Sequence, residues 1–488
     1  MSSLLPLFIA VPLGAAFFIP LVSLALKRVP DLLANAVMLA LAALACLAIG
    51  QTGEYVPGGW GAHLGAALRL DGLTVLMLII INTIGLAMAI FSVQYMTRYT
   101  SKLRYYSIFL CMVAGLNGIA LTGDLFSLYI FMEIVAISSY ALVAFGCEHD
   151  ELEAAFKYAV LGTVASAFIL IGIALLYAML GTLNMVEAAA RIAAGGINRP
   201  LTMALGLFIC GFGLKAALVP FHAWLPDAHP SAPAPVSAIL SGVVIKTAGI
   251  YVLARLVFNV FSIQLVPDML LILRTLGLVS MVAGGILSLG QWDMKRLLAY
   301  SSISQIGYIV VGLGLGTPLG LVGALFHMLN HSVFKSLLFL NAGAVEYATG
   351  SRDLKSLGGL WRNMPFTANI SLVGSMSISG IPPFNGFWSK LIIVLACLES
   401  GHPWLALAAV AMSLATLAAL LKMQKHAFYN DHKPASALAA EVPFLMRAAM
   451  ILLAVLCVLI ALLVLAGFRN PYLIGPAADA LRAWGGAG

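Results

Sequence analysis

The sequence predicts an all-α membrane protein with about fourteen transmembrane helices, and its composition and its apolar stretches both point to that fold class. Of its 488 residues, 62% are hydrophobic and only 9% are charged, whereas a soluble chain carries roughly a quarter charged residues. Apolar stretches of about 20 residues, the length that crosses a bilayer, recur along almost the whole chain. We therefore expect one polytopic membrane domain over residues 1–488 and no soluble domain.

Short polar segments, such as Gly123-Asp124 and Thr317-Pro318, separate neighbouring apolar stretches. The first stretch, Leu4 to Leu26, lacks the basic region and cleavage site of a signal peptide and is expected to be the first span. The amphipathic segment from Asn184 to Ala194 is expected to lie along the outer surface. The expected spans have their centres at Ala15, Leu41, Ile81, Val113, Val135, Leu170, Ile209, Val244, Met281, Ile309, Leu329, Met376, Met412 and Val455.

The placement of the basic residues predicts the orientation of the chain. Outside the spans, fifteen basic residues fall on one face, beginning with Lys27 and Arg28, and seven fall on the other. Because cytoplasmic loops carry the excess of lysine and arginine, the first face is expected to be cytoplasmic. Both termini are then expected on the outer face of a prokaryotic inner (plasma) membrane. The net charge of +7 thus orients the helices and requires no nucleic-acid partner.

Two of the expected spans look broken at a proline, Pro220 in the seventh and Pro383 in the twelfth. Proline lacks an amide hydrogen and clashes with the preceding turn, so each helix is expected to unwind there. Both breaks carry Pro-Phe followed closely by tryptophan. Broken helices at corresponding positions in a transporter indicate inverted repeats with the transport path between them. We therefore expect two inverted repeats, each with one broken helix.

Ionisable side chains within the apolar stretches are the candidate functional residues. Glu133, Lys215, Lys246 and Lys390 lie on four separate spans, and each costs about 2.5–3.5 kcal/mol at a helix centre on insertion scales. Such groups must be paired, hydrated or both. In a medium of low dielectric constant, neighbouring groups have coupled proton affinities, so a proton that arrives at one site changes the affinity of the next. A static salt bridge is the alternative for any single pair, but four separate groups favour a proton relay.

The eleventh span adds three titratable residues on one helical face, because His327, His331 and Lys335 are spaced four residues apart. Histidine titrates near neutral pH and can pass a proton between its ring nitrogens. Histidines that only pack and hydrogen-bond are the alternative, and the register with lysine favours the relay. Zinc would need a third ligand, and none is evident. Four polar residues of the tenth span either hold water between these groups or bond neighbouring helices: Ser301, Ser302, Ser304 and Gln305.

Polar residues near the helix ends are open to two interpretations. His222, Asp227 and His229 flank the loop after the seventh span and form either a proton uptake point or an ordinary polar loop. Asp71 is expected to cap the third span. The six cysteines form no CxxC pair and the chain carries no P-loop motif. We therefore expect no metal, no cofactor and no catalytic site, and energy that comes from an ion gradient or from a partner.

Four stretches of the chain resemble the antiporter-like membrane subunits of respiratory complex I, Mrp-type Na+/H+ antiporters and energy-converting membrane-bound hydrogenases. They are Gly123–Glu133, Leu214–Lys246, His327–Asn341 and Gly380–Lys390. The resemblance implies a 14-helix core with two inverted five-helix repeats. The expected parts are repeat one at about 105–258, repeat two at about 267–424, and flanking helices in 1–104 and 440–488.

The resemblance also implies roles for individual residues. Glu133 matches the family's fifth-helix glutamate, which pairs with the seventh-helix lysine, here Lys215. The remaining matches, on the eighth, eleventh and twelfth helices, are Lys246, His327, His331 and Lys390.

These observations predict a proton-translocating, antiporter-like subunit of a multisubunit membrane complex, with Na+ as a further candidate ion. The host would be either a redox-driven complex of the complex I or hydrogenase type or a cation/proton antiporter, and the partners would be other membrane subunits and the bilayer. A stand-alone transporter of an organic solute and a structural membrane anchor with an inactive ion path are the alternatives. The expected pathway consists of Glu133, Lys215, Lys246, His327, His331, Lys335 and Lys390, with uptake near His222, Asp227, His229 and the breaks at Pro220 and Pro383.

Overall fold

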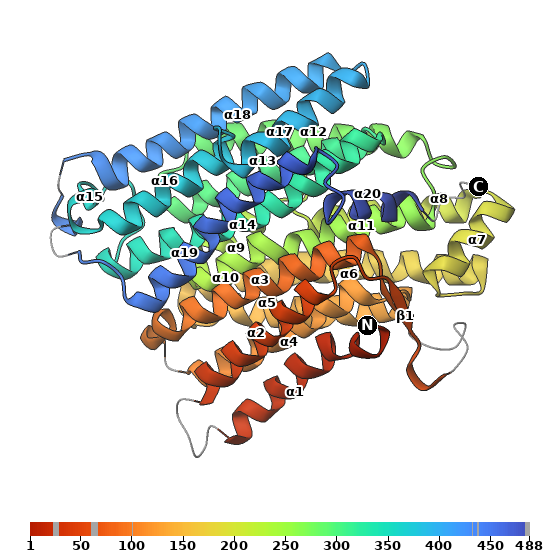
Figure 1. The fold of residues 1–488 in the computed structure, drawn as a ribbon, viewed down its shortest axis with the longest axis horizontal. Coiled ribbons are helices and arrows are strands. Elements are labelled where there is room, and N and C mark those ends of the chain that lie inside the picture. Colours follow the sequence, from red (N-terminus) through yellow and green to blue (C-terminus); the bar gives the residue numbers. More distant parts are fainter. Residues whose placement is uncertain (23–28, 60–66, 100, 432, 437–438, 484–488) are drawn as a thin grey trace.

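The chain folds into a bundle of long helices that run roughly side by side (Figure 1). We describe it from a computed structural model, which covers residues 1–22, 29–59, 67–99, 101–431, 433–436 and 439–483. Lys27 and Arg28, two basic residues of the expected cytoplasmic set, lie outside these ranges. Eleven helical stretches of the described residues are long and apolar enough to cross a membrane, which identifies a multi-pass membrane protein.

Each of the fourteen expected span centres lies within a helix of the structure. The first nine of these helical stretches are α1 Leu7–Val22, α2 Val29–Leu47, α3 Gly72–Tyr95, α4 Lys102–Leu121, α5 Leu125–Val143, α6 His149–Leu180, α8 Arg199–Lys215, the stretch that begins with α10 Ala234–Ile239 and continues to Val260, and α12 Asp268–Leu289. The others are α13 Met294–Gly314, α14 Pro318–Thr349, α16 Pro365–Ser379 with α17 Asn385–Glu399, α18 Pro403–Gln424 and α19 Phe444–Leu459.

Side-chain caps begin several of these helices. The carboxylate of Asp71 accepts a hydrogen bond from the backbone amide of Thr74 at 2.9 Å, as expected. Asp124 and Asp293 cap α5 and α13 in the same way. Because the first amides of a helix lack partners within the helix, these caps fix where each helix begins.

Both expected helix breaks are present. Helix α8 ends at Lys215 and helical structure resumes in α9, Leu225–Ser231, so Pro220 lies in the break. Helix α16 ends at Ser379, its C-cap Gly380 has a φ of 77°, and Pro383 precedes α17.

The helical stretch that follows α9 has unusually wide turns. After α10 it continues through the π-helical segments η4 Leu240–Val244, η5 Lys246–Tyr251 and η6 Arg255–Val260, with the short α11, Val252–Ala254, between the last two. π-helical turns are rare and occur frequently at functional sites. Lys246 is the first residue of the second segment.

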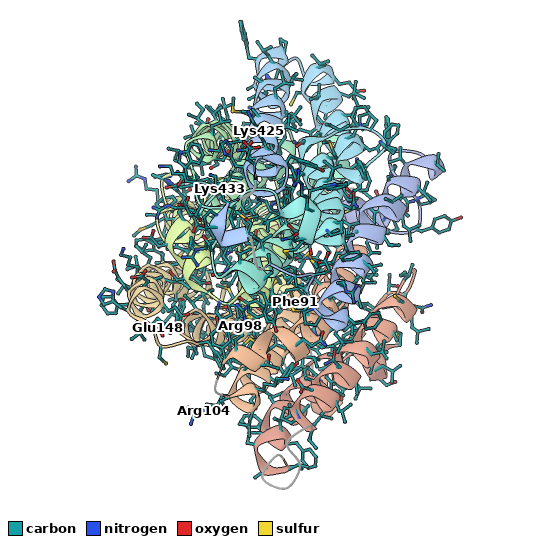
Figure 2. The ribbon with its side chains drawn as sticks, turned by 90° about the vertical axis from the view of Figure 1, so that its left-hand side faces the viewer. Phe91, Arg98, Arg104, Glu148, Lys425 and Lys433 are labelled. Carbon is teal, nitrogen blue, oxygen red and sulfur yellow. The ribbon has the colours of Figure 1, made fainter. Side chains whose placement is uncertain are left out.

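The two ends of the bundle differ. One end carries α7, Met185–Gly195, the amphipathic helix that the sequence predicts, and Figure 1 places both chain termini toward this end. A two-stranded sheet, β1 Gly53–Tyr55 with β2 Leu68–Leu70, pairs Glu54 with Arg69 and was not expected. The opposite end carries α15, Leu360–Asn363. Seen from that end, the labelled basic residues include Arg98, Arg104, Lys425 and Lys433 (Figure 2).

Glycines allow α12 and α13 to pack closely. A Cβ atom added at Gly307 would collide with the backbone of Met281 and Gly277. A Cβ atom at Gly284 would likewise meet the backbone of Ser304. This close approach fixes α13, which carries several of the polar residues described below.

We predict that Gly307→Val lowers the midpoint of thermal unfolding in detergent, because overpacking a close helix contact costs typically 1–3 kcal/mol. The matched control is Gly206→Val on α8, where an added Cβ meets no atom within 4 Å. Equal midpoints for the two variants would contradict the packing described here.

Candidate functional site

Lys246 lies at the centre of the candidate site with its side chain fully buried. Its Nζ donates hydrogen bonds to the backbone carbonyl oxygens of Ser241 at 2.5 Å and Gly242 at 3.0 Å. Within the described part of the chain, no carboxylate lies within 4.0 Å of this ammonium group. Carbonyl dipoles of its own helix therefore replace a counter-ion.

His327, His331 and Lys335 share one face of α14, as their spacing predicts, and all three are fully buried. The ring centroids of the two histidines are 6.2 Å apart. Nδ1 of His327 lies 2.9 Å from the hydroxyl of Ser389. Neither ring nitrogen of His331 has a hydrogen-bond partner among the described residues. Because unpaired buried polar atoms cost about 1–3 kcal/mol each, His331 is costly to keep for packing alone.

Lys390, on α17 just after the second break, completes the row. Its Nζ donates to the carbonyl of Ile378 at 2.8 Å and to the hydroxyl of Ser413 at 3.1 Å. The same ammonium lies 5.0 Å from the ring centroid of Tyr308, and the Tyr308 ring lies 5.5 Å from that of His327. Tyr308 therefore lies between Lys390 and His327, a position that no sequence pattern indicates.

Serine hydroxyls connect Lys246 with Lys335. The hydroxyl of Ser241, whose carbonyl binds Lys246, lies 2.8 Å from the hydroxyl of Ser302 on α13. The neighbouring Ser301 accepts a hydrogen bond from Lys335 Nζ at 2.5 Å. Polar residues of the expected tenth span therefore bond neighbouring helices directly. This is one of the two interpretations of these residues, the other being that they hold water.

Glu133 and Lys215 are near each other but do not form an ion pair. The carboxylate of Glu133, on α5, accepts a hydrogen bond from Ser166 of α6. Lys215 lies at the C-terminal end of α8, and the charge of Glu133 acts on it. No carboxylate of the described residues lies within 4.0 Å of Lys215 Nζ. The structure thus differs from the closed pair that the family resemblance implies.

The candidate uptake residues lie at the end of the bundle opposite α7. Asp227 pairs with Lys157 at 3.2 Å and with Arg296 at 3.5 Å, and all three line a surface pocket of about 190 Å³. His229 is fully buried below this pocket, whose wall includes the next residue, Pro230. Neither of its ring nitrogens has a partner in the described chain.

A stacked phenylalanine joins His229 to the central row. The ring of His229 stacks on Phe339 at 4.6 Å, and Lys335 Nζ lies 5.9 Å from the same phenylalanine ring. His222 lies just before α9 and is half-buried, and its Nδ1 has no partner in the described structure.

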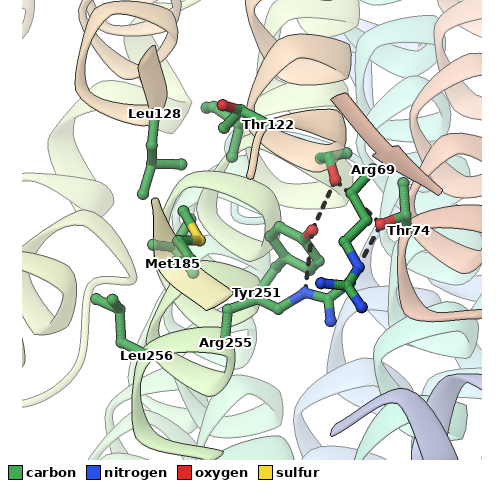
Figure 3. Close-up of a pocket in the computed structure, with 11 residues that line it drawn as sticks. Arg69, Thr74, Thr122, Leu128, Met185, Tyr251, Arg255 and Leu256 are labelled. Carbon is green, nitrogen blue, oxygen red and sulfur yellow. Dashed lines mark hydrogen bonds between the residues drawn. The ribbon is translucent and has the colours of Figure 1, made fainter. Parts of the chain in front are cut away.

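A second buried charge cluster lies toward the α7 end, and sequence reasoning missed it. Figure 3 shows Arg255 with Thr74 and Tyr251 from this cluster. Arg255 Nη2 donates to Asp71 at 2.5 Å and to the hydroxyl of Thr74 at 3.1 Å. Its Nε donates to the hydroxyl of Tyr251 at 3.2 Å, which in turn donates to the carbonyl of Ala120 at 2.7 Å. Asp71 and Arg255 are 184 residues apart in the chain, so no local pattern could have joined them.

The Asp71 carboxyl at this cluster titrates below its usual range. Burial alone raises its pKa, but the charge of Arg255 and the hydrogen bonds from Arg255 and Thr74 outweigh burial and lower the pKa. Asp71 is therefore both a helix cap and a counter-ion.

Comparisons with protein families identify two matching regions. Residues 122–416, more than half of the chain, match a family described as NADH:quinone oxidoreductase/Mrp antiporter, TM. Residues 60–106 match the N-terminus of chain 5 of NADH-ubiquinone oxidoreductase (complex I).

Similar proteins come from bacteria and archaea. NADH-quinone oxidoreductase subunit N of Desulforudis audaxviator is 37% identical over 84% of this chain and 82% of its own. A Na(+)/H(+) antiporter subunit of Alkalihalophilus pseudofirmus is 35% identical over 77% of this chain and 76% of its own.

Two solved structures share the fold over nearly the full length. A chain of the Mrp complex from Dietzia sp. superposes with a TM-score of 0.90 at 29% identity, covering 99% of this chain and 98% of that one. A chain of the archaeal membrane-bound sulfane sulfur reductase gives a TM-score of 0.89 at 30% identity, covering 99% of this chain and 97% of that one.

We predict that Asp71→Asn destabilises the protein by about 3 kcal/mol at pH 7, because it leaves a buried arginine without its counter-ion. The folded-state pKa of Asp71 is depressed, so its contribution is present above the unfolded value of about 3.9 and is lost as the pH falls through the folded value. Unfolding measured from pH 7 to pH 3 should show the two proteins converging in acid. Asp479→Asn, at the exposed pair with Arg469, is the control, and an equal effect there would contradict the prediction.

Proposed function

The chain belongs to the NADH:quinone oxidoreductase/Mrp antiporter transmembrane family, and we propose that it is the ion-translocating, antiporter-like subunit of a multisubunit membrane complex. Two of its relatives are named as subunits of a quinone oxidoreductase and of a Na(+)/H(+) antiporter. The two solved structures compared above are both multisubunit membrane complexes. These names support other membrane subunits as partners and H+ as the transported ion, with Na+ as a second candidate.

The observation that carries the proposal is a row of buried titratable side chains without carboxylate partners. In the described chain, Lys246, Lys335 and Lys390 bind only carbonyl and hydroxyl oxygens. A static salt bridge would place a carboxylate beside each of them. A lysine side chain held only by dipoles can lose a proton as an ammonium and regain it as an amine without breaking an ion pair, which suits it to a relay.

The contacts between these groups suggest a route. Protons enter through the pocket at Asp227 and reach Lys335 and Lys246 by way of His229. They continue through His331 and His327 to Lys390, which lies beside Tyr308. A change of charge at one end opens or closes the Glu133–Lys215 pair, and the separation of these two groups in the structure corresponds to its open form. Water between the groups would complete the route.

Matching local structures support two inverted repeats, at about 105–258 and 267–424. Leu125 donates to the carbonyl of Leu183, and Met185 donates to that of Gly123. An equivalent pair of backbone hydrogen bonds recurs further along the chain. There the residue that follows the cap Asp293 takes the place of Leu125, which follows the cap Asp124. Met294 donates to Arg352 and Leu354 donates to Trp292.

The helices between these bonds match as well. Helices α6 and α14 each contain 32 residues and end at a glycine of positive φ, Gly181 and Gly350. Figure 1 places α7, which follows α6, at the opposite end of the bundle from α15, which follows α14. Two inverted repeats within a membrane domain of fourteen spans require that equivalent helices end at opposite ends of the bundle. Helices α6 and α14 meet this requirement.

We predict that Glu133→Ala and Lys215→Ala each abolish proton pumping while the complex remains assembled in the membrane. Removal of either group leaves the other without the charge that sets its proton affinity. Proton uptake by liposomes that contain the chain with its copurified partners gives the rate. Arg199→Gln, which removes an exposed charge, is the control. Loss of the complex from the membrane in both test variants would instead favour a static structural role.

We predict that His331→Phe lowers the transport rate at least tenfold without lowering the midpoint of thermal unfolding. Phenylalanine fills a similar volume and removes two buried ring nitrogens that have no partner in the described structure, so a purely packing histidine should tolerate the change. Unchanged transport in the liposome assay would remove His331 from the pathway.

A further inference from the structure

A group of basic residues surrounds Trp292 at the end of the bundle opposite α7. Lys422 Nζ lies 4.7 Å from the centroid of the Trp292 ring, and Lys355 Nζ lies 5.2 Å from it. His426 packs edge-on against the same ring at 5.1 Å. Lys422, Lys425 and Lys433 all lie close enough to His426 for their charges to act on it. We call Lys355, Lys422, Lys425 and Lys433 the Trp292 cluster.

The Trp292 cluster lacks the carboxylate partners that several other basic residues at this end have. Lys157, Lys295, Arg296 and Arg352 each pair with a carboxylate. No member of the Trp292 cluster has a carboxylate within 4.0 Å, as far as the structure describes the chain.

The charge of the cluster is only partly balanced by its surroundings. Lys422 donates to the carbonyls of Leu289 and Gln291 at 2.6 Å each and so caps the end of α12. Lys433 donates to the carbonyl of Lys355. The exposed carboxylates of nearby segments are Asp353 and Asp431, two against four ammonium groups. The cluster therefore has an excess of positive charge.

The position of the cluster identifies the source of the missing anion. Trp292 is 37% exposed, and at the same end of the bundle Trp361 packs on Tyr429 at 5.4 Å. Aromatic residues of this kind occupy the level of lipid headgroups. Below the cluster, α12 and α18 pack together and present apolar side chains outward, among them Ile286, Leu287 and Leu421. A ligand here meets cations at its head and apolar helices along its tail.

We propose that the Trp292 cluster binds the phosphate headgroup of an anionic phospholipid, whose acyl chains lie along α12 and α18. Basic groups at the membrane interface attract anionic lipids, and basic sites between transmembrane helices bind their headgroups. Positive-inside orientation alone explains the sign of these charges. It does not explain why they gather around one exposed tryptophan without carboxylates.

The test compares lipid binding by the full-length chain, in the presence of its copurified partners, with that of charge-matched variants. Lys355→Gln/Lys425→Gln removes two charges of the cluster and spares Lys422, which caps α12. Arg104→Gln/Arg199→Gln removes two exposed charges elsewhere. The readout is the amount of phosphatidylglycerol or phosphatidylcholine retained from mixed micelles, measured by native mass spectrometry.

We expect the wild-type protein to retain phosphatidylglycerol over phosphatidylcholine, and the cluster variant to bind phosphatidylglycerol about tenfold more weakly. The control variant should bind it as the wild type does. Equal retention of the two lipids would overturn the proposal, as would equal losses in the two variants. Displacement of phosphatidylglycerol by millimolar inorganic phosphate would also overturn it, because the site would then recognise free phosphate. A copurified subunit that covers the cluster and blocks lipid binding would point to a protein contact instead and overturn it as well.

Discussion

The structure depends on keeping several ammonium groups inside an apolar bundle without carboxylates beside them. A charge at the centre of a membrane helix costs about 2.5–3.5 kcal/mol on insertion scales, and Lys246, Lys335 and Lys390 are each at most 5% exposed. Carbonyl oxygens of nearby helix turns and serine hydroxyls offset part of this cost. Lys246 binds carbonyl oxygens of the π-helical turns, and Lys390 binds a carbonyl oxygen beside the second helix break. Non-helical backbone at membrane depth is tolerated where it lies inside the protein, as it does here.

Much of this arrangement could be predicted from the sequence, because bilayer thickness and the cost of buried charge act on local patterns. Runs of about 20 apolar residues revealed the spans, and Pro220 and Pro383 revealed the two breaks. The four-residue spacing of His327, His331 and Lys335 placed them on one face. In each case the signal lies within a few turns of one helix, where helical geometry fixes the outcome.

The remaining features required the fold, because they depend on contacts between distant segments. The Asp71–Arg255 pair joins residues from the third and eighth spans, and each residue alone has an ordinary explanation as a cap or as an outer-face charge. Tyr308 lies between Lys390 and His327 only because α13 packs beside α14 and α17. Glu133 accepts a hydrogen bond from Ser166 and does not pair with Lys215, a difference in side-chain position that no sequence pattern records. The short β1–β2 hairpin also escaped notice, because three-residue strands carry little periodicity.

The two ends of the bundle connect differently to its centre. At the α15 end, the proposed route runs from the pocket at Asp227 to His229 and then to the lysines, and the proposed lipid site is the Trp292 cluster. At the α7 end, Arg255 contacts Asp71 and Thr74 at the start of α3 and Tyr251 on its own helical stretch. Tyr251 lies on the same π-helical segment as Lys246, so one irregular helix carries both residues.

Lys246 lies at the centre of the proposed pathway, and its substitution tests the central claim most directly. Proton flux should be measured in liposomes that contain the assembled complex, with wild-type chain or with Lys246→Met, which keeps the apolar stem and removes the charge. We expect flux to fall to the background of protein-free liposomes while subunit composition and thermal unfolding are retained. Flux equal to that of the wild type would contradict the relay, because protons would then cross without the central buried amine.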